Sequence, residues 1–283
     1  MSDEIISVRD ISGKALSDIN DRKDGLPTGL YQLDDKIRGL KPAEYVIIAA
    51  RPSMGKTSLA VDIALESGKE NRVVFFSIEM SPTMVVQRML ANLAEVNLYK
   101  FYHGQLLDSA FGKLEMAKKE LERRDIWFDN SSYITPNSIA NKISRVDDID
   151  MVIIDYIQLM GGTGGNNVGR VEEMSDISRR LKALALNLNK PVVVLSQLNR
   201  SPDIRDNHRP FLSDLRDSGS LEQDADIILF LYREDYYKPN LDDGNAEIIV
   251  AKNRNGPTGK VNCFFNKGLA RFEDYKKESE VFK

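Results

Sequence analysis

A loop that could bind phosphate follows a short apolar run near residue 50. The run Val46-Ile47-Ile48-Ala49-Ala50 is typical of a buried strand, and Lys56-Thr57-Ser58-Leu59-Ala60 is typical of the first turns of a helix. Backbone N–H groups in such a loop point inward, and the helix start adds the positive end of its dipole. The sequence therefore predicts a nucleotide site that is formed by Ser53, Met54, Gly55, Lys56, Thr57 and Ser58.

Two side chains of this loop have the chemistry that phosphoryl transfer needs. Lys56 offers a compact cation to the β- and γ-phosphates, and the Thr57 hydroxyl offers a ligand to Mg²⁺. The usual pattern begins with Gly, and Ala50 stands at that place here. A methyl group is the smallest side chain with a Cβ, so the loop can still close. A chance Gly-Lys-Thr in a turn is the alternative, which the flanking strand and helix disfavour.

Three further apolar runs end at the polar residues Glu79, Asp155 and Gln197. Ligands of doubly wound sheets bind at the C-terminal edges of the strands, so these side chains are expected around the same loop. Taken singly, each has an ordinary structural interpretation, as a helix cap, a solvated strand end or a turn residue. Their joint placement around one phosphate-binding loop favours a functional site.

These residues predict hydrolysis of a nucleotide with Mg²⁺, by transfer of the γ-phosphoryl group to water. Asp155 would order the metal and its waters, Glu79 would polarise the attacking water, and Gln197 would sense the γ-phosphate. The transition state spreads negative charge over the γ-oxygens and needs a further cation, which a neighbouring subunit often delivers. Lys252 and Arg254 are candidates for this cation, with a solvated β-turn as the alternative for the pair.

The order of predicted elements indicates an α/β fold. Strands and helices alternate through residue 200 and mostly strands follow, which predicts a mostly parallel twisted sheet with helices on both faces and antiparallel edge strands. An amphipathic helix over residues 5–20 either packs on its own core or is an arm that docks on a neighbouring subunit. We expect a helix with a polar linker at 1–24 and one large domain at 25–283.

Composition excludes several other classes of site. The single cysteine, Cys263, permits no intrachain disulfide and no Cys-rich zinc site, and two histidines supply a metal site poorly. These features, with no signal core and no apolar run long enough for a bilayer, predict a cytoplasmic protein without a membrane partner. The net charge of −4 argues against a broad basic face for duplex DNA but leaves room for a narrow groove.

Several motifs together resemble the DnaB-type replicative DNA helicases. They are Gly25-Leu26-Pro27-Thr28-Gly29, Ala49 to Thr57, Phe76 to Ser81, Ile154 to Leu159, Leu195 to Arg200, Asp214 to Asp226, and Lys252 to Gly259. The resemblance covers residues 25 to about 275 and is highly specific. Ala50 in place of Gly is the form that this family itself uses.

The resemblance implies a RecA-like P-loop NTPase that works as the motor domain of a homo-hexameric helicase. It implies ATP and Mg²⁺ as cofactors, 5′ to 3′ movement on single-stranded DNA, and primase and a helicase loader as partners. It implies that Lys252 and Arg254 act in trans on the nucleotide of the next subunit. Family members also carry a helical N-terminal collar domain, whereas this sequence starts at what resembles the linker helix. A shortened form and a short phage- or plasmid-borne branch both fit that difference.

The resemblance also implies that Arg216, Asp217 and Gly219 line a central channel and hold the DNA backbone. Arg216 supplies a phosphate partner, Gly219 allows close approach of the backbone, and Asp217 replaces the commoner Glu of the family. The glycine-rich run 161–165 corresponds to a second channel loop that orders with DNA. Arg88 is a weaker candidate for nucleotide contact, with a surface salt bridge as the alternative.

Two other functions share parts of this pattern. A RecA-class strand-exchange protein has the same fold, a base like Glu79 and DNA-binding loops. The runs Asp214 to Gly219 and Lys252 to Gly256 favour the helicase over it. A non-catalytic ATP-binding scaffold is disfavoured because Lys56, Thr57, Glu79 and Asp155 are all present.

Overall fold

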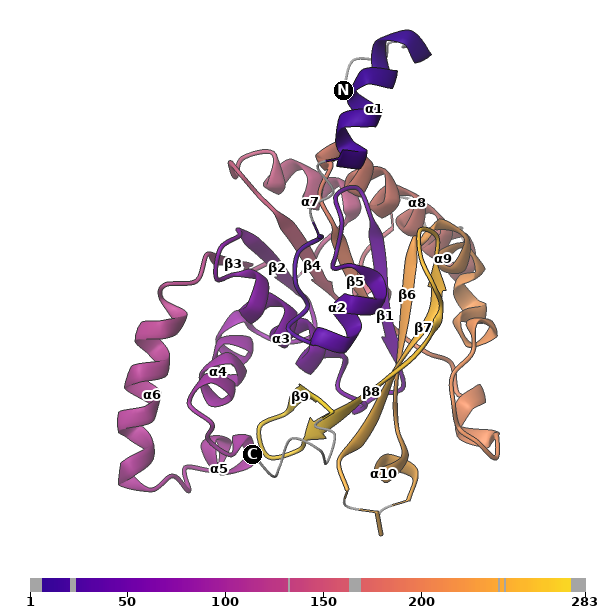
Figure 1. Cartoon of the computed structure of the whole chain (residues 1–283). Coiled ribbons are helices and arrows are strands. Elements are labelled where there is room, and N and C mark those ends of the chain that lie inside the picture. Colours follow the sequence, from indigo (N-terminus) through magenta and orange to yellow (C-terminus); the bar gives the residue numbers. More distant parts are fainter. Residues whose placement is uncertain are drawn as a thin grey trace.

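The protein is built on one mixed β-sheet (Figure 1). The computed structural model describes residues 7–20, 24–131, 133–162, 169–238, 240–241 and 243–275, with side chains at all of these except 14, 15, 17–20 and 216–218. None of the helices in these ranges combines the length and the apolar character that a bilayer crossing requires.

Six parallel strands form the larger part of the sheet. Their order is β3 (Ile126–Asp129), β2 (Val73–Ser77), β4 (Met151–Asp155), β5 (Val192–Gln197), β1 (Tyr45–Ala50) and β6 (Ile227–Arg233). The antiparallel strands β7 (Asn245–Asn253), β8 (Gly259–Asn266) and β9 (Arg271–Asp274) continue it from β6. The predicted mostly parallel sheet with antiparallel edge strands is therefore confirmed.

Helices cover both faces, which explains the continuous apolar runs of the central strands. Every residue of β1, β2, β4 and β6 is buried, as expected for parallel strands with helices on both sides. One face packs against α2 (Tyr31–Ile37), α3 (Lys56–Ser67) and α4 (Pro82–Leu93). The other packs against α7 (Pro136–Ile143) and α8 (Arg170–Leu188). The helices α5 (Leu98–Tyr102) and α6 (Asp108–Leu121) stand beside α4, where α6 shares a small separate core with it.

Short helices follow the ends of three strands. They are η1 (Ile157–Leu159) after β4, η2 (Ser201–Ile204), η3 (Leu212–Ser218) and α9 (Gly219–Asp224) after β5, and α10 (Glu234–Tyr237) after β6. Elements of three to seven residues are too short to show a helical period in the sequence, so the pattern did not predict them. η1, η2 and α10 place polar loops at the edge of the sheet where the predicted site lies, whereas α9 leads to the start of β6 at the opposite edge.

The N-terminal helix α1 (Val8–Asn20) lies apart from the sheet (Figure 1). It confirms residues 8–20 of the predicted helix, and residues 5 and 6 lie outside the described part. Val8 is 77% exposed and Leu16 62% exposed, so among the side chains that the structure describes on this helix, these apolar groups find little cover. For these described side chains, the structure does not show packing on the chain's own core, the first alternative for this helix.

A carboxylate on α3 joins the helix after the phosphate-binding loop to two other elements. Asp62 accepts a hydrogen bond from Asn92 Nδ2 of α4 at 2.7 Å and from the Phe272 backbone N–H of β9 at 2.9 Å. Burial raises the pKa of Asp62 to about 7, although these hydrogen bonds oppose the shift. Asp62 therefore titrates near neutral pH in the folded chain and well below it in the unfolded chain.

This difference makes stability depend on pH. Because folded Asp62 binds its proton more tightly than unfolded Asp62, raising the pH from 5 to 8 should destabilise the wild type through this group. The Asp62→Asn variant cannot titrate there. We expect the wild type to lose about 2–3 kcal/mol relative to this variant between the two pH values, measured by urea unfolding.

Asp150 provides the control. The hydrogen bond from Lys190 lowers the pKa of Asp150 in spite of burial, so its stability contribution is lost only at acid pH. The Asp150→Asn variant should therefore keep the wild-type change between pH 5 and 8. A change in Asp62→Asn as large as in the wild type would contradict the assignment.

Candidate functional site

A cavity of about 520 Å³ lies at the C-terminal edge of the parallel strands. Predicted residues that line it are Ser53, Gly55, Lys56, Thr57, Ser58, Glu79, Arg88 and Gln197. The remaining lining residues are Pro52, Met80, Leu98, Tyr156, Arg233, Phe265, Lys267 and Ala270. The structure thus brings residues from the ends of β2, β4, β5 and β6, and from α4, around one loop.

The backbone of the loop between β1 and α3 has the shape of a phosphate cradle. Ser53 and Gly55 have φ angles of +63° and +104°. A Cβ on Gly55 would lie only 3.0 Å from the Phe272 ring, so glycine is required there. Lys56 Nζ donates to the Ala50 carbonyl at 3.4 Å, which shows that the loop closes with Ala50. The Met54 side chain is buried in the core, so this residue can offer a ligand only its backbone.

Thr57 and Asp155 fit a magnesium ion. The Thr57 hydroxyl donates to Asp155 Oδ2 at 2.8 Å, and the buried Asp155 Oδ1 has no hydrogen-bond partner in the described part of the chain. Burial raises the pKa of Asp155 to about 6, against the Thr57 hydrogen bond and the charge of Lys56. An unsatisfied carboxylate oxygen beside a hydroxyl is a donor set that Mg²⁺ prefers.

Further metal ligands would have to come from phosphate and water. Across the described residues, no group of three or more His, Cys, Asp and Glu side chains is arranged to hold a metal ion. Mg²⁺ in nucleotide sites usually keeps several waters and binds through one or two protein groups together with phosphates. Thr57 and Asp155 could therefore be the two protein ligands of a metal that arrives with a nucleotide.

Two charged side chains flank this pair. Burial lowers the pKa of Lys56, while the charges of Asp155 and Glu79 raise it, so the three groups form one electrostatic cluster. Glu79 is exposed just after β2, as a group that polarises water must be. Arg88 Nε is buried without a hydrogen-bond partner among the described residues, and the charge of Arg88 lowers the pKa of Asp155. The structure thus favours nucleotide contact over a surface salt bridge for Arg88.

Gln197 is held at the edge of the cavity by a glutamine that sequence reasoning did not single out. The backbone N–H of Gln197 donates to Gln158 Oε1 at 3.1 Å, and Gln158 Nε2 donates back to the Gln197 carbonyl at 3.1 Å. Gln197 also lines a neighbouring cavity of about 390 Å³ together with Arg170 and Arg200. It therefore lies between the phosphate-binding loop and the segments that follow β4 and β5.

Lys252 and Arg254 do not reach this cavity. β7 runs antiparallel to β6, and Lys252 pairs with Ile228 at the start of β6, at the opposite edge of the sheet from the phosphate-binding loop. Arg254 follows β7 in the turn to β8. Within one chain, these two cations cannot contact the nucleotide that the loop would bind.

The predicted DNA-binding residues lie after β5. The backbone of Arg216 and Asp217 belongs to η3, and their side chains lie outside the described part. Gly219 begins α9 and is exposed, and a Cβ added to it would meet no atom within 4 Å. Of the glycine-rich run 161–165, residues 163–165 also lie outside the described part.

Arg233 is a residue of the cavity that the sequence pattern missed. It ends β6, and its guanidinium forms a two-pronged pair with Asp235 at 3.1 and 3.2 Å and lies 4.0 Å from the centroid of the Phe265 ring. Its Nη1 donates to the Ser53 carbonyl at 3.3 Å, and Lys267 Nζ lies 2.7 Å from Asp235 Oδ2. Arg233 thus braces the phosphate-binding loop. Its position at the end of an apolar strand was the available signal.

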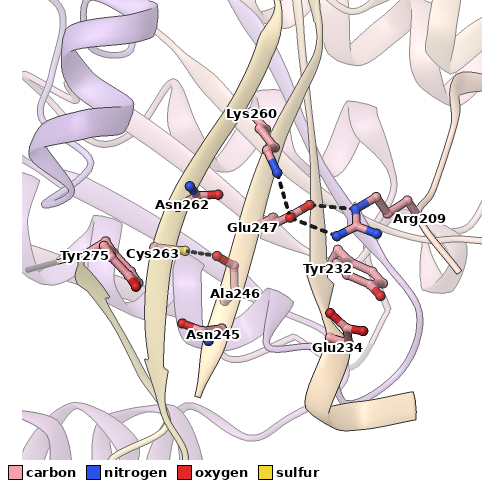
Figure 2. A pocket seen from close by; sticks show the side chains of 10 residues that line it. All are labelled: Arg209, Tyr232, Glu234, Asn245, Ala246, Glu247, Lys260, Asn262, Cys263 and Tyr275. Atoms are coloured by element: carbon pink, nitrogen blue, oxygen red, sulfur yellow. Dashed lines mark hydrogen bonds and ion pairs between the residues drawn. The ribbon is translucent and has the colours of Figure 1, made fainter. Parts of the chain in front are cut away.

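A second cavity, of about 310 Å³, lies on strands β6 to β8, away from the phosphate-binding loop (Figure 2). Glu247 accepts both prongs of Arg209 at 2.9 and 3.0 Å and also Lys260 Nζ at 3.0 Å. The Arg209 guanidinium lies 4.4 Å from the centroid of the Tyr232 ring. Arg209 therefore makes the same kinds of contact as Arg233, a two-pronged ion pair and an aromatic contact, but it does not contact the phosphate-binding loop.

Comparisons with known proteins agree on one family. Residues 25–274 match the family described as DnaB-like helicase C terminal domain. The replicative DNA helicase DnaB of Geobacillus stearothermophilus is 43% identical over 254 residues, which are 88% of this chain and 56% of that protein. The chain therefore spans little more than half the length of this relative.

Solved structures, including that of a DnaB-like helicase, are also similar to this chain. One solved ATPase domain has a TM-score of 0.91 and 34% identity, with 96% of this chain and all of that chain covered. A DnaB-like replicative helicase, solved with its interactions with primase, has a TM-score of 0.87 and 35% identity over 97% of this chain and 68% of that one. The RadB recombinase, at 21% identity and a TM-score of 0.58 over 89% of this chain, shares the RecA-type fold alone.

The contacts of Arg233 with Asp235 and with the Ser53 carbonyl predict that Arg233→Lys weakens nucleotide binding. Lysine keeps the charge but loses the fork to Asp235 and the flat contact with Phe265, so the loop should lose its fixed shape. We expect affinity for a fluorescent ATP analogue to fall about tenfold, equivalent to about 1.4 kcal/mol.

Arg209→Lys is the matched control, because it removes the same kind of fork and aromatic contact in the cavity of Figure 2. Nucleotide affinity should stay at the wild-type value in this variant. Equal losses in both variants would mean that Arg233 supports the fold in general rather than the loop.

Proposed function

The chain belongs to the family of DnaB-like helicase C-terminal domains, and we propose that it is the ATP-hydrolysing motor of a replicative DNA helicase. In this proposal it moves 5′ to 3′ on single-stranded DNA as a ring hexamer of identical subunits. The single observation that carries the ATPase is the Thr57–Asp155 pair with its unsatisfied oxygen, set beside Lys56 in a closed loop.

Each side chain of the cavity has a defined task in the proposed reaction. Lys56 and the first N–H groups of α3 bind the β- and γ-phosphates, while Thr57 and Asp155 hold Mg²⁺, which supplies charge stabilisation to the phosphates. Glu79 accepts the proton of the attacking water from its exposed position after β2. Gln197 contacts the γ-phosphate and moves when it leaves.

The cation that completes the site comes from another subunit. Lys252 and Arg254 lie at the edge of the sheet opposite to the phosphate-binding loop, so they can serve a nucleotide only across an interface. A head-to-tail contact between identical chains repeats and closes into a ring when its rotation allows. The geometry thus supports a ring in which each subunit completes the next subunit's site.

The N-terminal helix supports the same assembly. α1 lies apart from the sheet, with Val8, Ile11 and Leu16 exposed (Figure 1). A helix with an apolar stripe needs a partner surface to be stable in water. We propose that α1 is the arm that docks on the neighbouring subunit, the second alternative for this segment.

The DNA-binding role rests on the segment between β5 and α9. Gly219 has a φ of −54° and open space where a Cβ would lie, so nothing in the packing of the described residues demands a glycine there. Close approach of a DNA backbone beside Arg216 and Asp217 would explain it. The similarity to a helicase solved with primase supports primase as a partner, and a helicase loader is proposed with it.

The function predicts a DNA-stimulated ATPase in an assembled state. We expect single-stranded DNA to raise the hydrolysis rate several-fold, and light scattering to give a hexamer mass with ATP present. The Lys56→Ala variant should lose at least a hundredfold in turnover, because it removes the cation of the phosphate cradle.

Lys69→Ala is the control for that variant, since Lys69 pairs with Glu66 on the surface after α3 and far from the cradle. It should hydrolyse ATP at the wild-type rate. Normal turnover in Lys56→Ala would refute the assigned site, and a DNA-insensitive rate would refute the motor.

The action across the interface predicts complementation between two inactive variants. Arg254→Ala should bind nucleotide normally yet hydrolyse it at least tenfold more slowly, because its neighbour lacks the stabilising cation. Mixing it with Lys56→Ala should restore part of the rate, since Lys56→Ala subunits supply intact Arg254 to intact loops. A mixture no more active than its components would argue against a shared site.

A further inference from the structure

The two cations that would act on a neighbour's nucleotide are anchored on their own chain at the end of α9. Lys252 Nζ donates to the Glu222 carbonyl at 2.6 Å and to the Gln223 carbonyl at 3.2 Å. Arg254 Nη2 donates to the same Gln223 carbonyl. Figure 1 shows the turn between β7 and β8 beside α9, at the far end of the sheet from α10. The C-terminal carbonyls of a helix attract cations, so this is a favourable anchor.

Asp226 fixes the second of these cations at two points. Its carbonyl accepts the Arg254 backbone N–H at 2.9 Å, and its Oδ1 lies 3.6 Å from Arg254 Nη1. The carboxylate is itself held, since Oδ2 accepts the Tyr45 backbone N–H at 2.8 Å and Lys182 Nζ at 2.6 Å. Asp226 is only 6% exposed. The contact therefore ties Arg254 to the first residue of β1 and to α8.

The anchored cations keep donors for a ligand. A guanidinium has five N–H donors and an ammonium has three. Arg254 donates one hydrogen bond to Gln223 and forms an ion pair with Asp226 at 3.6 Å, and Lys252 donates two hydrogen bonds to carbonyls, so both heads retain unused donors. The Arg254 side chain is 46% exposed. Because some N–H groups of Lys252 and Arg254 are bonded to this chain, the direction in which their unused N–H groups point is also fixed.

Asp226 does not by itself cancel the charge of Arg254. Lys182 lies nearer to the carboxylate than Arg254 does, at 2.6 Å against 3.6 Å, so the lysine offsets most of its charge. Burial and the neighbouring Arg254 lower the pKa of Lys252, which the charges of Asp226 and Glu222 oppose. With Glu222 and Asp224 included, the carboxylates around Lys182, Lys252 and Arg254 balance these cations, so a phosphate would be bound through the unused N–H donors of Lys252 and Arg254 rather than through a net positive charge.

We propose that Asp226 is a positioning residue for Arg254 in the hydrolysis of ATP by the neighbouring subunit, an inference that rests on the trans role proposed above. It holds the Arg254 backbone through its carbonyl and the guanidinium through its carboxylate. A catalytic cation must be fixed within a fraction of an ångström, and supporting hydrogen bonds supply that precision.

The same arrangement connects the cations to the DNA-binding segment. α9 begins at Gly219, directly after the segment that contains Arg216, and ends at the carbonyls that hold Lys252. Ser178 of α8 donates to Asp224 Oδ2 at 2.6 Å and holds the end of the helix. A shift of α9 on DNA binding would therefore move Lys252 and Arg254 together.

The test is the Asp226→Asn variant, which keeps the size of the side chain and an acceptor for the Tyr45 N–H but loses the charge. Alone, it should bind an ATP analogue within twofold of the wild type and hydrolyse ATP about tenfold more slowly. Mixed with excess Lys56→Ala, its rate per Asp226→Asn subunit should rise at least fivefold, because the neighbours then supply a well-placed Arg254. A loss of general structure would not be repaired by a neighbour.

Two controls separate the possible failures. Asp150→Asn removes a comparable carboxylate–lysine contact at the same edge of the sheet, with Lys190, and should hydrolyse ATP normally. Arg254→Ala mixed with Lys56→Ala reports on the trans site itself. If that mixture recovers and Asp226→Asn does not, or if Asp226→Asn is fully active alone, the inference is wrong and the proposed function stands. If neither mixture recovers ATP hydrolysis, both the trans site and this inference are refuted.

Asp226→Glu covers the case in which Asp226→Asn does not fold. It keeps the charge for Lys182 but displaces the carboxylate by one methylene. We expect a smaller loss of hydrolysis with the same recovery in the mixture. Full activity, or a loss that the mixture does not repair, would overturn the proposal.

Discussion

The shared direction of six parallel strands is the constraint on which the rest of the structure depends. Because β1, β2, β4, β5 and β6 run the same way, their C-terminal ends meet at one edge. The phosphate-binding loop, Asp155, Gln197 and Arg233 all follow from that geometry, with Glu79 just beyond β2. Residues separated by more than a hundred positions in the sequence therefore share one cavity. The antiparallel return of β7 has the opposite effect, since it carries Lys252 and Arg254 to the other edge. A site that needs both sets of residues must be divided between two chains.

The sequence predicted those parts of the protein that depend on local pattern. Continuous apolar runs identified the central strands, and a strand followed by Gly-Lys-Thr at the start of a helix identified the loop around Gly55. It did not identify Gln158, Arg233 or Asp226, because each acts through contacts with residues far away in the sequence. Met54 shows the reverse limit: the motif includes it, but its side chain turns into the core. The sequence also did not predict the short helices after β4, β5 and β6, since one or two turns are too short to show a helical periodicity of apolar residues.

Carboxylates in this fold have different roles that depend on what surrounds them. Asp226 and Asp150 each accept a backbone N–H at the edge where the parallel strands begin, and each is offset by a lysine, which makes them structural in themselves. Asp226 differs in that it is more deeply buried and Arg254 lies against it. A positioning role can therefore arise from an ordinary structural contact when a functional side chain is placed on top of it.

Asp155 illustrates the free-energy penalty that the proposed metal site places on folding. A buried carboxylate oxygen without a hydrogen-bond partner in the described residues destabilises a folded protein by about 1–3 kcal/mol. Burial also raises the pKa of Asp155 to about 6, so the ionised form that a metal needs is less favourable in the folded chain than in water. A divalent cation at this oxygen would relieve both penalties, because it would satisfy the oxygen and offset the charge. Binding of Mg²⁺ with a nucleotide would thus recover free energy that folding left unused, and the same binding would strengthen the contacts between the loop, β4 and the end of β6.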